Sequence, residues 1–235
     1  MPYAPSWTGC YVGAGGGYGL WDQENTNVDT ATGISNNATN SAAGRGWFGT
    51  VQAGCDYQFG VGGSQFVVGA FGDYDFDSLK GSHQTPFINL RGLVGSATAD
   101  EKMSSAWSVG GRVGWLITPS LLTYFSGGYT EATFDQQNFF GNTPALVPLN
   151  FFLDKRTYHG WFLGAGDEYA LNFLPGLYWK TEYRLSEFNT ERNSYLFLDT
   201  GLPTGNSVDS HKWVQTVRSE LVYHFNWGGP LVARY

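Results

Sequence analysis

The chain has few charged residues, only two cysteines and no long apolar run. Charged side chains make up 14% of its 235 residues, and the formal net charge is −7. No cluster of lysine and arginine forms the basic surface that nucleic-acid binding needs, so we expect no nucleic-acid partner. Two cysteines cannot form a disulfide framework. No segment approaches the length of apolar sequence that a membrane-spanning helix requires.

Glycine and aromatic residues are abundant instead. The chain contains 33 glycines, 9 tryptophans, 14 tyrosines and 17 phenylalanines, and 42% of its residues are hydrophobic. A chain this apolar can offset the entropy of ordering, so disorder is excluded. Glycine weakens helices, which argues against a helical bundle or a coiled coil. Residues 1–7 have neither the basic start nor the apolar core of a secretory signal. We therefore expect either a cytosolic protein or one whose signal was removed.

Apolar and polar residues alternate with a period of two along most of the chain. From Trp47 to Phe59, for example, the odd positions are apolar or small while the even positions include Gln52 and Asp56. Eight such runs occur, each about 11 to 15 residues long, and only the facing of the run 121–134 is ambiguous. Short connections are expected at residues 60–65, 118–120 and 172–176, and long ones at 21–44, 77–102, 135–158 and 189–211.

An even number of strands, with short turns on one side and long loops on the other, is typical of outer-membrane barrels. The sequence therefore predicts an all-β fold, namely an eight-stranded antiparallel up-and-down transmembrane β-barrel with four long extracellular loops and three short periplasmic turns. Residues 8–225 form the barrel in this interpretation. A periplasmic N-terminal segment, 1–7, precedes it, and a periplasmic C-terminal tail, 226–235, follows.

The facing of the charged strand residues distinguishes this barrel from a soluble one. In a soluble sandwich or a lipocalin they would face water, whereas in a membrane barrel they face the lumen. Tryptophan favours the membrane barrel, because aromatic girdles lie at both membrane interfaces. Seven tryptophans fall near the ends of the expected strands: Trp7, Trp47, Trp107, Trp115, Trp161, Trp179 and Trp227. Glycine suits the close backbone approach of a small, strongly curved barrel.

Several segments resemble one known family. They are SWTGCYVGAGGGYG from Ser6, WSVGGRVGWLITPSLLTYFSGGYTEATF from Trp107, GWFLGAGDEYAL from Gly160, WKTEYRLSEF from Trp179 and the terminal VYHFNWGGPLVARY. These resemble the alphaproteobacterial outer-membrane immunogenic-protein family, small porin-like barrels related in form to OmpA and OmpX. The resemblance implies a Gram-negative outer-membrane location, a removed signal peptide and no cofactor. It implies little about molecular activity.

Ten charged strand residues are expected to face the lumen, and the facing of Glu131 is uncertain. They are Asp56, Asp73, Asp75, Arg112, Glu168, Lys180, Glu182, Arg184, Arg218 and Glu220. The interior of an eight-stranded barrel is only wide enough for side chains to fill it. We therefore expect a hydrogen-bonded salt network that closes the lumen, and a narrow gated ion path through the same network is the alternative.

Cys10 and Cys55 are expected to form a disulfide. A first hairpin that is symmetric about its long loop pairs Leu20 with Arg45, and the same register pairs Cys10 with Cys55. Similar barrels have aromatic residues at both positions, and the oxidising periplasm permits the bond. Two free buried thiols are the alternative, which a register shift of two residues would favour.

Asp167 is anomalous, because its parity places a carboxylate on the lipid face, where it costs energy in a depth-dependent way. Three explanations are open: a position near the interface, a bulge at residues 164–166 that turns it inward, or contact with a neighbouring protein. Apolar residues also crowd the long loops, either as a cap or as an interface with another protein. The candidate partner contacts are Asp167, Phe139, Phe140, Phe151, Phe152 and Phe197.

Three functions follow from these features. The first is a structural barrel that supports the envelope, contacts outer-membrane lipid and lipopolysaccharide, and packs against other envelope proteins through its apolar loops. The second is a porin-like conduit for ions or very small solutes. The third is a rim enzyme acting on lipid or peptide, but His83, His159 and His211 lack metal-ligand spacing and no nucleophile motif accompanies them. We therefore expect no catalytic site, no metal and no bound cofactor.

Overall fold

The computed structural model describes residues 5–35, 39–88, 94–141, 147–171 and 173–225. Its strands are β1 (Gly9–Asp29), β2 (Asn40–Val61), β3 (Ser64–Ile88), β4 (Val94–Thr118), β5 (Leu121–Phe134), β6 (Gln137–Gly141), β7 (Pro148–Leu153), β8 (Arg156–Ala170), β9 (Leu177–Phe197) and β10 (Pro203–Phe225). No helix among the described residues is both long and apolar enough to cross a bilayer.

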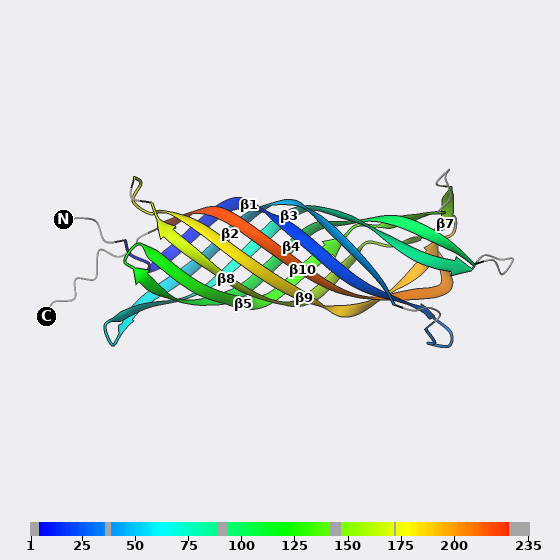
Figure 1. The fold of residues 1–235 in the computed structure, drawn as a ribbon, viewed down its shortest axis with the longest axis horizontal. Coiled ribbons are helices and arrows are strands. Elements are labelled where there is room, and N and C mark those ends of the chain that lie inside the picture. Colours follow the sequence, from blue (N-terminus) through cyan, green and yellow to red (C-terminus); the bar gives the residue numbers. More distant parts are fainter. Residues whose placement is uncertain (1–4, 36–38, 89–93, 142–146, 172, 226–235) are drawn as a thin grey trace.

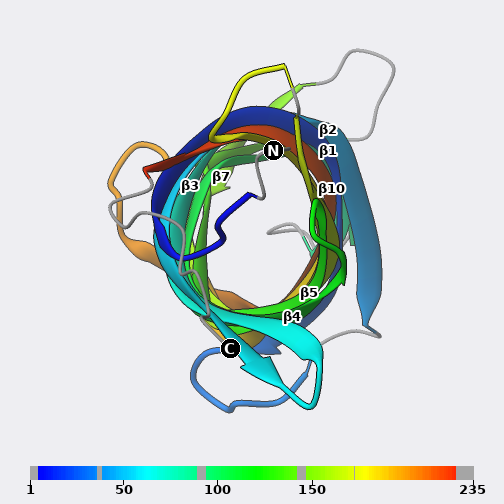
Figure 2. The same cartoon turned by 90° about the vertical axis from the view of Figure 1, so that its left-hand side faces the viewer.

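The long strands form a closed antiparallel ring. β1 to β5 pair in chain order, β5 pairs with β8, and β8, β9 and β10 follow. β10 then pairs with β1 and closes the ring, which Figure 2 shows end on. The start of β1, the end of β10 and the three short turns lie together at the left-hand end in Figure 1. In an outer-membrane barrel this short-turn end is periplasmic.

The described residues form ten strands, so the predicted number of eight is wrong, although eight of the ten make up the closed ring. The wall breaks after β5 and again before β8, at polar residues. At the second break Asp154 accepts a hydrogen bond from the backbone N–H of Lys155 through its own side chain. Beyond the breaks, β6 replaces β5 as the partner of β4, and β7 replaces β8 as the partner of β9. The two extra strands thus extend the same wall at its extracellular end.

Much of the chain predicted as long loop is also strand. β1 continues to Asp29 and β2 begins at Asn40, so the first predicted loop shrinks at both ends. The reason lies in the side chains: Asp22 and Glu24 face outward there, and Gln23 and Asn25 face inward. With both faces polar, hydrophobic alternation disappears although backbone pairing continues.

An apolar belt surrounds the outer face of the barrel. Its extracellular border includes Trp47, Phe76, Trp107 and Trp161, and the exposed fraction of Trp47 reaches 72%. Trp115 and Trp179 are exposed on the same outer face toward the periplasmic end. This arrangement matches the aromatic girdles of membrane barrels. Trp227, which was also predicted for a girdle, lies outside the described residues.

Trp7 is not a girdle residue, contrary to the prediction. Its side chain is fully buried, and Figure 2 shows the segment before β1 crossing the inside of the ring. The Trp7 indole Nε1–H donates to the carbonyl oxygen of Pro119 at 3.2 Å, and Tyr178 donates its hydroxyl to the carbonyl oxygen of Ser6. Trp7 therefore plugs the periplasmic mouth instead of meeting lipid.

Inward-facing glycines make room for large rings in the narrow lumen. A Cβ atom at Gly44 would overlap the indole of Trp21, and a Cβ at Gly110 would lie 2.8 Å from the ring of Phe162. Glycine on the inner wall therefore permits aromatic side chains from neighbouring strands to cross the interior. The structure also settles which face of the run 121–134 points inward: Leu122 and Tyr124 face the lumen and Phe125 faces outward.

The predicted disulfide is confirmed. Cys10 pairs with Cys55 between β1 and β2, and the Leu20–Arg45 pair lies in the same register. The two sulfur atoms are bonded, and both residues are exposed on the outer face.

We expect the unreduced protein to be lighter than the reduced protein by two hydrogen atoms in intact mass spectrometry. Replacing both cysteines by serine should leave the barrel folded, because the β1–β2 hairpin already holds the two strands together. Quantitative alkylation of two thiols without prior reduction would contradict the bond.

Candidate functional site

The lumen holds most of the ionisable side chains of the membrane-spanning wall. All ten residues predicted to face it are buried. Four are basic, and each bridges two carboxylates, so the surplus of acids is shared among them. The pairs are Arg112 with Asp56 and Glu168, Arg184 with Asp73 and Glu182, Arg218 with Asp73 and Asp75, and Lys180 with Glu182 and Glu220.

The central network spans strands that are far apart in the sequence. Arg184 on β9 lies 2.9 Å from Asp73 on β3 and 2.8 Å from Glu182. Arg218 on β10 lies 2.9 Å from Asp75. Lys180 donates to Gln52 at 2.8 Å and lies 3.7 Å from Glu220. The contacts of β9 with Asp73 and Gln52, and of β10 with Asp75, cross the barrel interior and tie distant parts of the wall together. Glu182 and Glu220 lie on the same or the neighbouring strand as their partners.

A second, smaller network lies toward the periplasmic end. Arg112 donates to both oxygens of Asp56 and lies 2.7 Å from Glu168. The other oxygen of Glu168 is 2.8 Å from Nε2 of His224, which is also buried in the lumen. The Arg112 guanidinium lies over the ring of Tyr11, with 4.7 Å to the centroid, which adds a cation–π contact.

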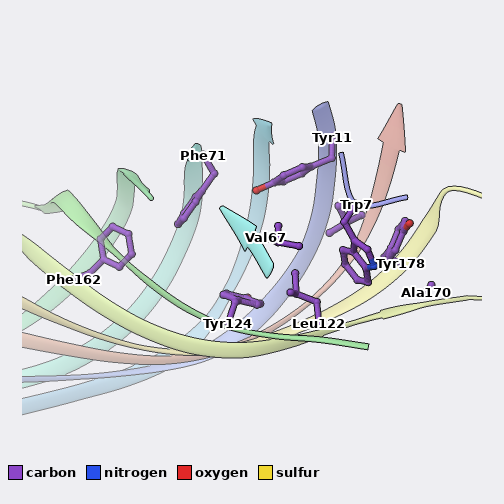
Figure 3. Close-up of a cluster of buried hydrophobic side chains, with 10 residues drawn as sticks. Trp7, Tyr11, Val67, Phe71, Leu122, Tyr124, Phe162, Ala170 and Tyr178 are labelled. Atoms are coloured by element: carbon purple, nitrogen blue, oxygen red, sulfur yellow. The ribbon is translucent and has the colours of Figure 1, made fainter. Parts of the chain in front are cut away.

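Aromatic side chains separate and cover these charges. Figure 3 shows Trp7 beside Tyr178 and Leu122, with Tyr124, Phe71 and Phe162 further along the lumen. The centroids of Trp7 and Tyr178 are 4.7 Å apart. Trp7 thus closes the lumen just below the smaller network.

A third charged layer, inside the extracellular part of the barrel, was missed from the sequence. Lys212 lies 2.6 Å from Glu101, and the Glu101 carboxylate also accepts a hydrogen bond from Gln23. The Lys212 ammonium group is 4.2 Å from the ring centroid of Phe134 and 4.9 Å from that of Tyr158. Glu101 fell inside a predicted loop. No hydrophobic alternation between Asp22 and Asn27 could have indicated that the strands extend this far.

Apolar side chains close the extracellular end. A buried cluster contains Ala97, Ala99, Phe139, Leu153, Tyr195 and Val208. Phe139 is 1% exposed, so its assignment as a partner contact is wrong. Phe151 packs against the same cluster, whereas Phe140 and Phe152 are half-buried and Phe197 is exposed. Phe139 and Phe151 therefore belong to an apolar cap that closes the lumen, because they lie on paired strands and face inward. Phe197 remains on the surface.

Asp167 faces outward, as its parity predicts, and the bulge explanation is wrong. The pairing of β8 with β5 and with β9 continues without a shift through Gly164, Gly166 and Asp167. Its Oδ1 atom accepts a hydrogen bond from the Thr123 hydroxyl at 2.5 Å.

The histidines do not gather into one site. His83 is buried inside the extracellular part, with its Nδ1 atom 3.1 Å from Oε1 of Gln137. His159 lies on the outer face, 3.1 Å from Glu131, and His211 lies 3.3 Å from Glu187. Within the described part of the chain, no group of three or more His, Cys, Asp or Glu residues could hold a metal ion.

A closed antiparallel barrel with an apolar outer belt and a filled, charged lumen defines an outer-membrane β-barrel protein. The fold is similar to that of the outer membrane protein OprG from Pseudomonas aeruginosa, with a TM-score of 0.57, 14% sequence identity, and coverage of 94% of this chain and 99% of that one. No protein-family model matches the chain.

Sequence similarity identifies the family. The chain is 30% identical over 227 residues to the 31 kDa outer-membrane immunogenic protein of Brucella melitensis, which covers 94% of this chain and 84% of the relative. The protein of the same name from Brucella suis matches equally. The chain belongs to this family of outer-membrane immunogenic proteins, and its location is the outer membrane of a Gram-negative bacterium.

We expect Arg112→Ala to lower the free energy of unfolding by about 3–5 kcal/mol, because it leaves two buried carboxylates without their partner. The measurement is urea unfolding of the refolded barrel in detergent, followed by tryptophan fluorescence. Arg192→Ala is the matched control: Arg192 forms an exposed ion pair with Asp209, which water and salt screen, so little change is expected.

A triple variant distinguishes the two causes of a lower free energy of unfolding, namely unpaired carboxylates and lost side-chain packing. Arg112→Met combined with Asp56→Asn and Glu168→Gln removes the uncompensated charges and should recover part of the loss. Equal stability of Arg112→Ala and the wild type would contradict the network.

Proposed function

We propose that this protein is a structural, non-enzymatic outer-membrane barrel whose lumen is permanently closed. The observation that carries the proposal is the filling of the lumen along its length. Trp7 and its neighbours lie at the periplasmic mouth, two ion-pair networks lie in the middle, and two apolar clusters with the Lys212 layer between them fill the extracellular part. A conducting pore of this size would need a continuous wet path, and buried aromatic layers interrupt it.

The outer surface indicates which molecules the barrel contacts, and we propose that these are lipids around the belt and envelope proteins at the extracellular end. Outer-membrane lipid and lipopolysaccharide surround the wall, and the strands above the belt carry the extracellular end away from the membrane. That end still exposes apolar side chains, including Val147, Phe197, Leu198 and Leu202. Exposed apolar groups at one end favour contact with other envelope proteins there.

We expect no steady conductance from the wild-type barrel in proteoliposomes or planar bilayers. Insertion is verified independently, by protection of the transmembrane wall from protease and by the shift in gel mobility that heating causes in folded barrels. Reproducible ohmic single-channel steps from inserted protein would contradict closure and would favour the porin-like alternative.

Partner contact is tested with a cross-linker applied to whole cells. We expect Phe197→Ser, Leu198→Ser and Leu202→Ser together to reduce cross-linked complexes at the extracellular end. Phe173→Ser with Leu174→Ser is the matched control, because these exposed apolar residues lie at a periplasmic turn. Unchanged complexes in the extracellular variant would contradict the loop contact.

A further inference from the structure

Asp167 is chemically out of place on the outer surface of the barrel. It faces outward near the level of Trp115 on the periplasmic border of the belt. The outward-facing Glu131 and Glu187, opposite the tryptophans of the extracellular border, each lie beside a histidine. The ten charged residues of the two ion-pair networks turn into the lumen instead. A carboxylate that meets lipid is unfavourable unless something compensates its charge.

The protein itself supplies a hydrogen bond but no counter-charge. In the antiparallel register Asp167 stands between Thr123 on β5 and Thr181 on β9. The Thr123 hydroxyl occupies one carboxylate oxygen at 2.5 Å. Over the described residues, no lysine, arginine or histidine lies within ion-pair distance of Asp167. The part of the chain that the structure describes thus leaves the charge of Asp167 without a counter-ion.

A hollow in the outer surface lies at this carboxylate. Its volume is about 270 Å³, and it is lined by Leu121, Asp167, Tyr169, Trp179 and Thr181. Tyr169 and Trp179 are 42% and 50% exposed, so their rings are accessible from the membrane. Aromatic faces attract cations, and a carboxylate next to them strengthens the preference for positive charge. The hollow thus combines a carboxylate, two hydroxyl groups and two aromatic rings.

The depth of the hollow indicates which part of the membrane reaches it. Asp167 lies three residues before the end of β8 at Ala170, which is about 10 Å along the strand. That end carries the short turns, so it faces the periplasm. A hollow this close to the periplasmic end is within reach of the headgroups of the periplasmic leaflet.

We propose that this hollow binds the primary ammonium headgroup of a phospholipid, with Asp167 as the counter-ion. The ammonium group donates hydrogen bonds to the carboxylate while the rings of Tyr169 and Trp179 contact its charge. A lipid headgroup fits the observations better than a protein partner. The hollow has the size of a headgroup, and its surroundings are lipid-facing apolar side chains, whereas a specific protein interface buries an area of about 1,000 Å² or more.

The test measures lipid selectivity. Refolded protein in detergent is titrated with an equal mixture of phosphatidylethanolamine and phosphatidylglycerol of the same acyl chains, and retained lipid is counted by native mass spectrometry. An interfacial ion pair together with a cation–π contact predicts an approximately fivefold to tenfold preference for phosphatidylethanolamine. Asp167→Asn should abolish the preference, and Trp179→Leu should reduce it.

The matched control is Asp22→Asn, an exposed outward-facing carboxylate beyond the other border of the belt, which should leave the preference unchanged. Every variant is first shown to be folded by its heat-dependent gel mobility. An identical lipid ratio for the wild type and Asp167→Asn would overturn the proposal. It would also be overturned if Asp167→Asn released a stoichiometric protein from native membranes without changing the lipid ratio.

Discussion

Hydrocarbon offers no hydrogen-bond partner to a backbone, and this constraint determines the rest of the structure. Every N–H and C=O in the membrane must be paired within the protein, which for strands requires a closed ring. The pairing of β1 with β10 meets this requirement. Closure with so few strands leaves an interior only wide enough for side chains. Because side chains alternate along a strand, half of the wall must then be packed into that narrow space.

The filled interior explains the chemistry of the inward face. A charge without a partner there would be costly, and the ten charged residues of the two central networks occur as shared pairs. Arg184 and Lys180 both contact Glu182, and Tyr124 donates its hydroxyl to the same carboxylate at 2.8 Å. Neutral donors thus complement the basic side chains where acids are in surplus. The aromatic layers above and below remove water, which strengthens the ion pairs and separates one network from the next.

The sequence predicts the membrane-spanning part of this fold well and the extracellular part poorly, for one physical reason. Between Trp47 and Phe59 one face meets lipid and the other meets the lumen, so hydrophobicity alternates and strand, facing and register can be derived. Beyond Asp22 both faces are polar, and the same backbone geometry leaves no hydrophobic signal. Trp7 illustrates a different limit, because local sequence cannot distinguish a tryptophan at the interface from one that enters the lumen. Arg184 contacts Glu182 on its own strand, which alternation predicts, and Asp73 on β3, which only closure of the ring brings within reach.

The closed lumen that we propose also determines where recognition can occur. With the interior filled by its own side chains, selectivity toward other molecules has to reside on the outside of the wall or at its extracellular end. The outside is uniform over most of the belt, since small and apolar residues make it equivalent for any acyl chain. Asp167 breaks that uniformity at one depth and on one side of the barrel. An ion pair at that position would orient the barrel relative to the periplasmic leaflet, just as the extracellular strands fix its opposite end outside the membrane.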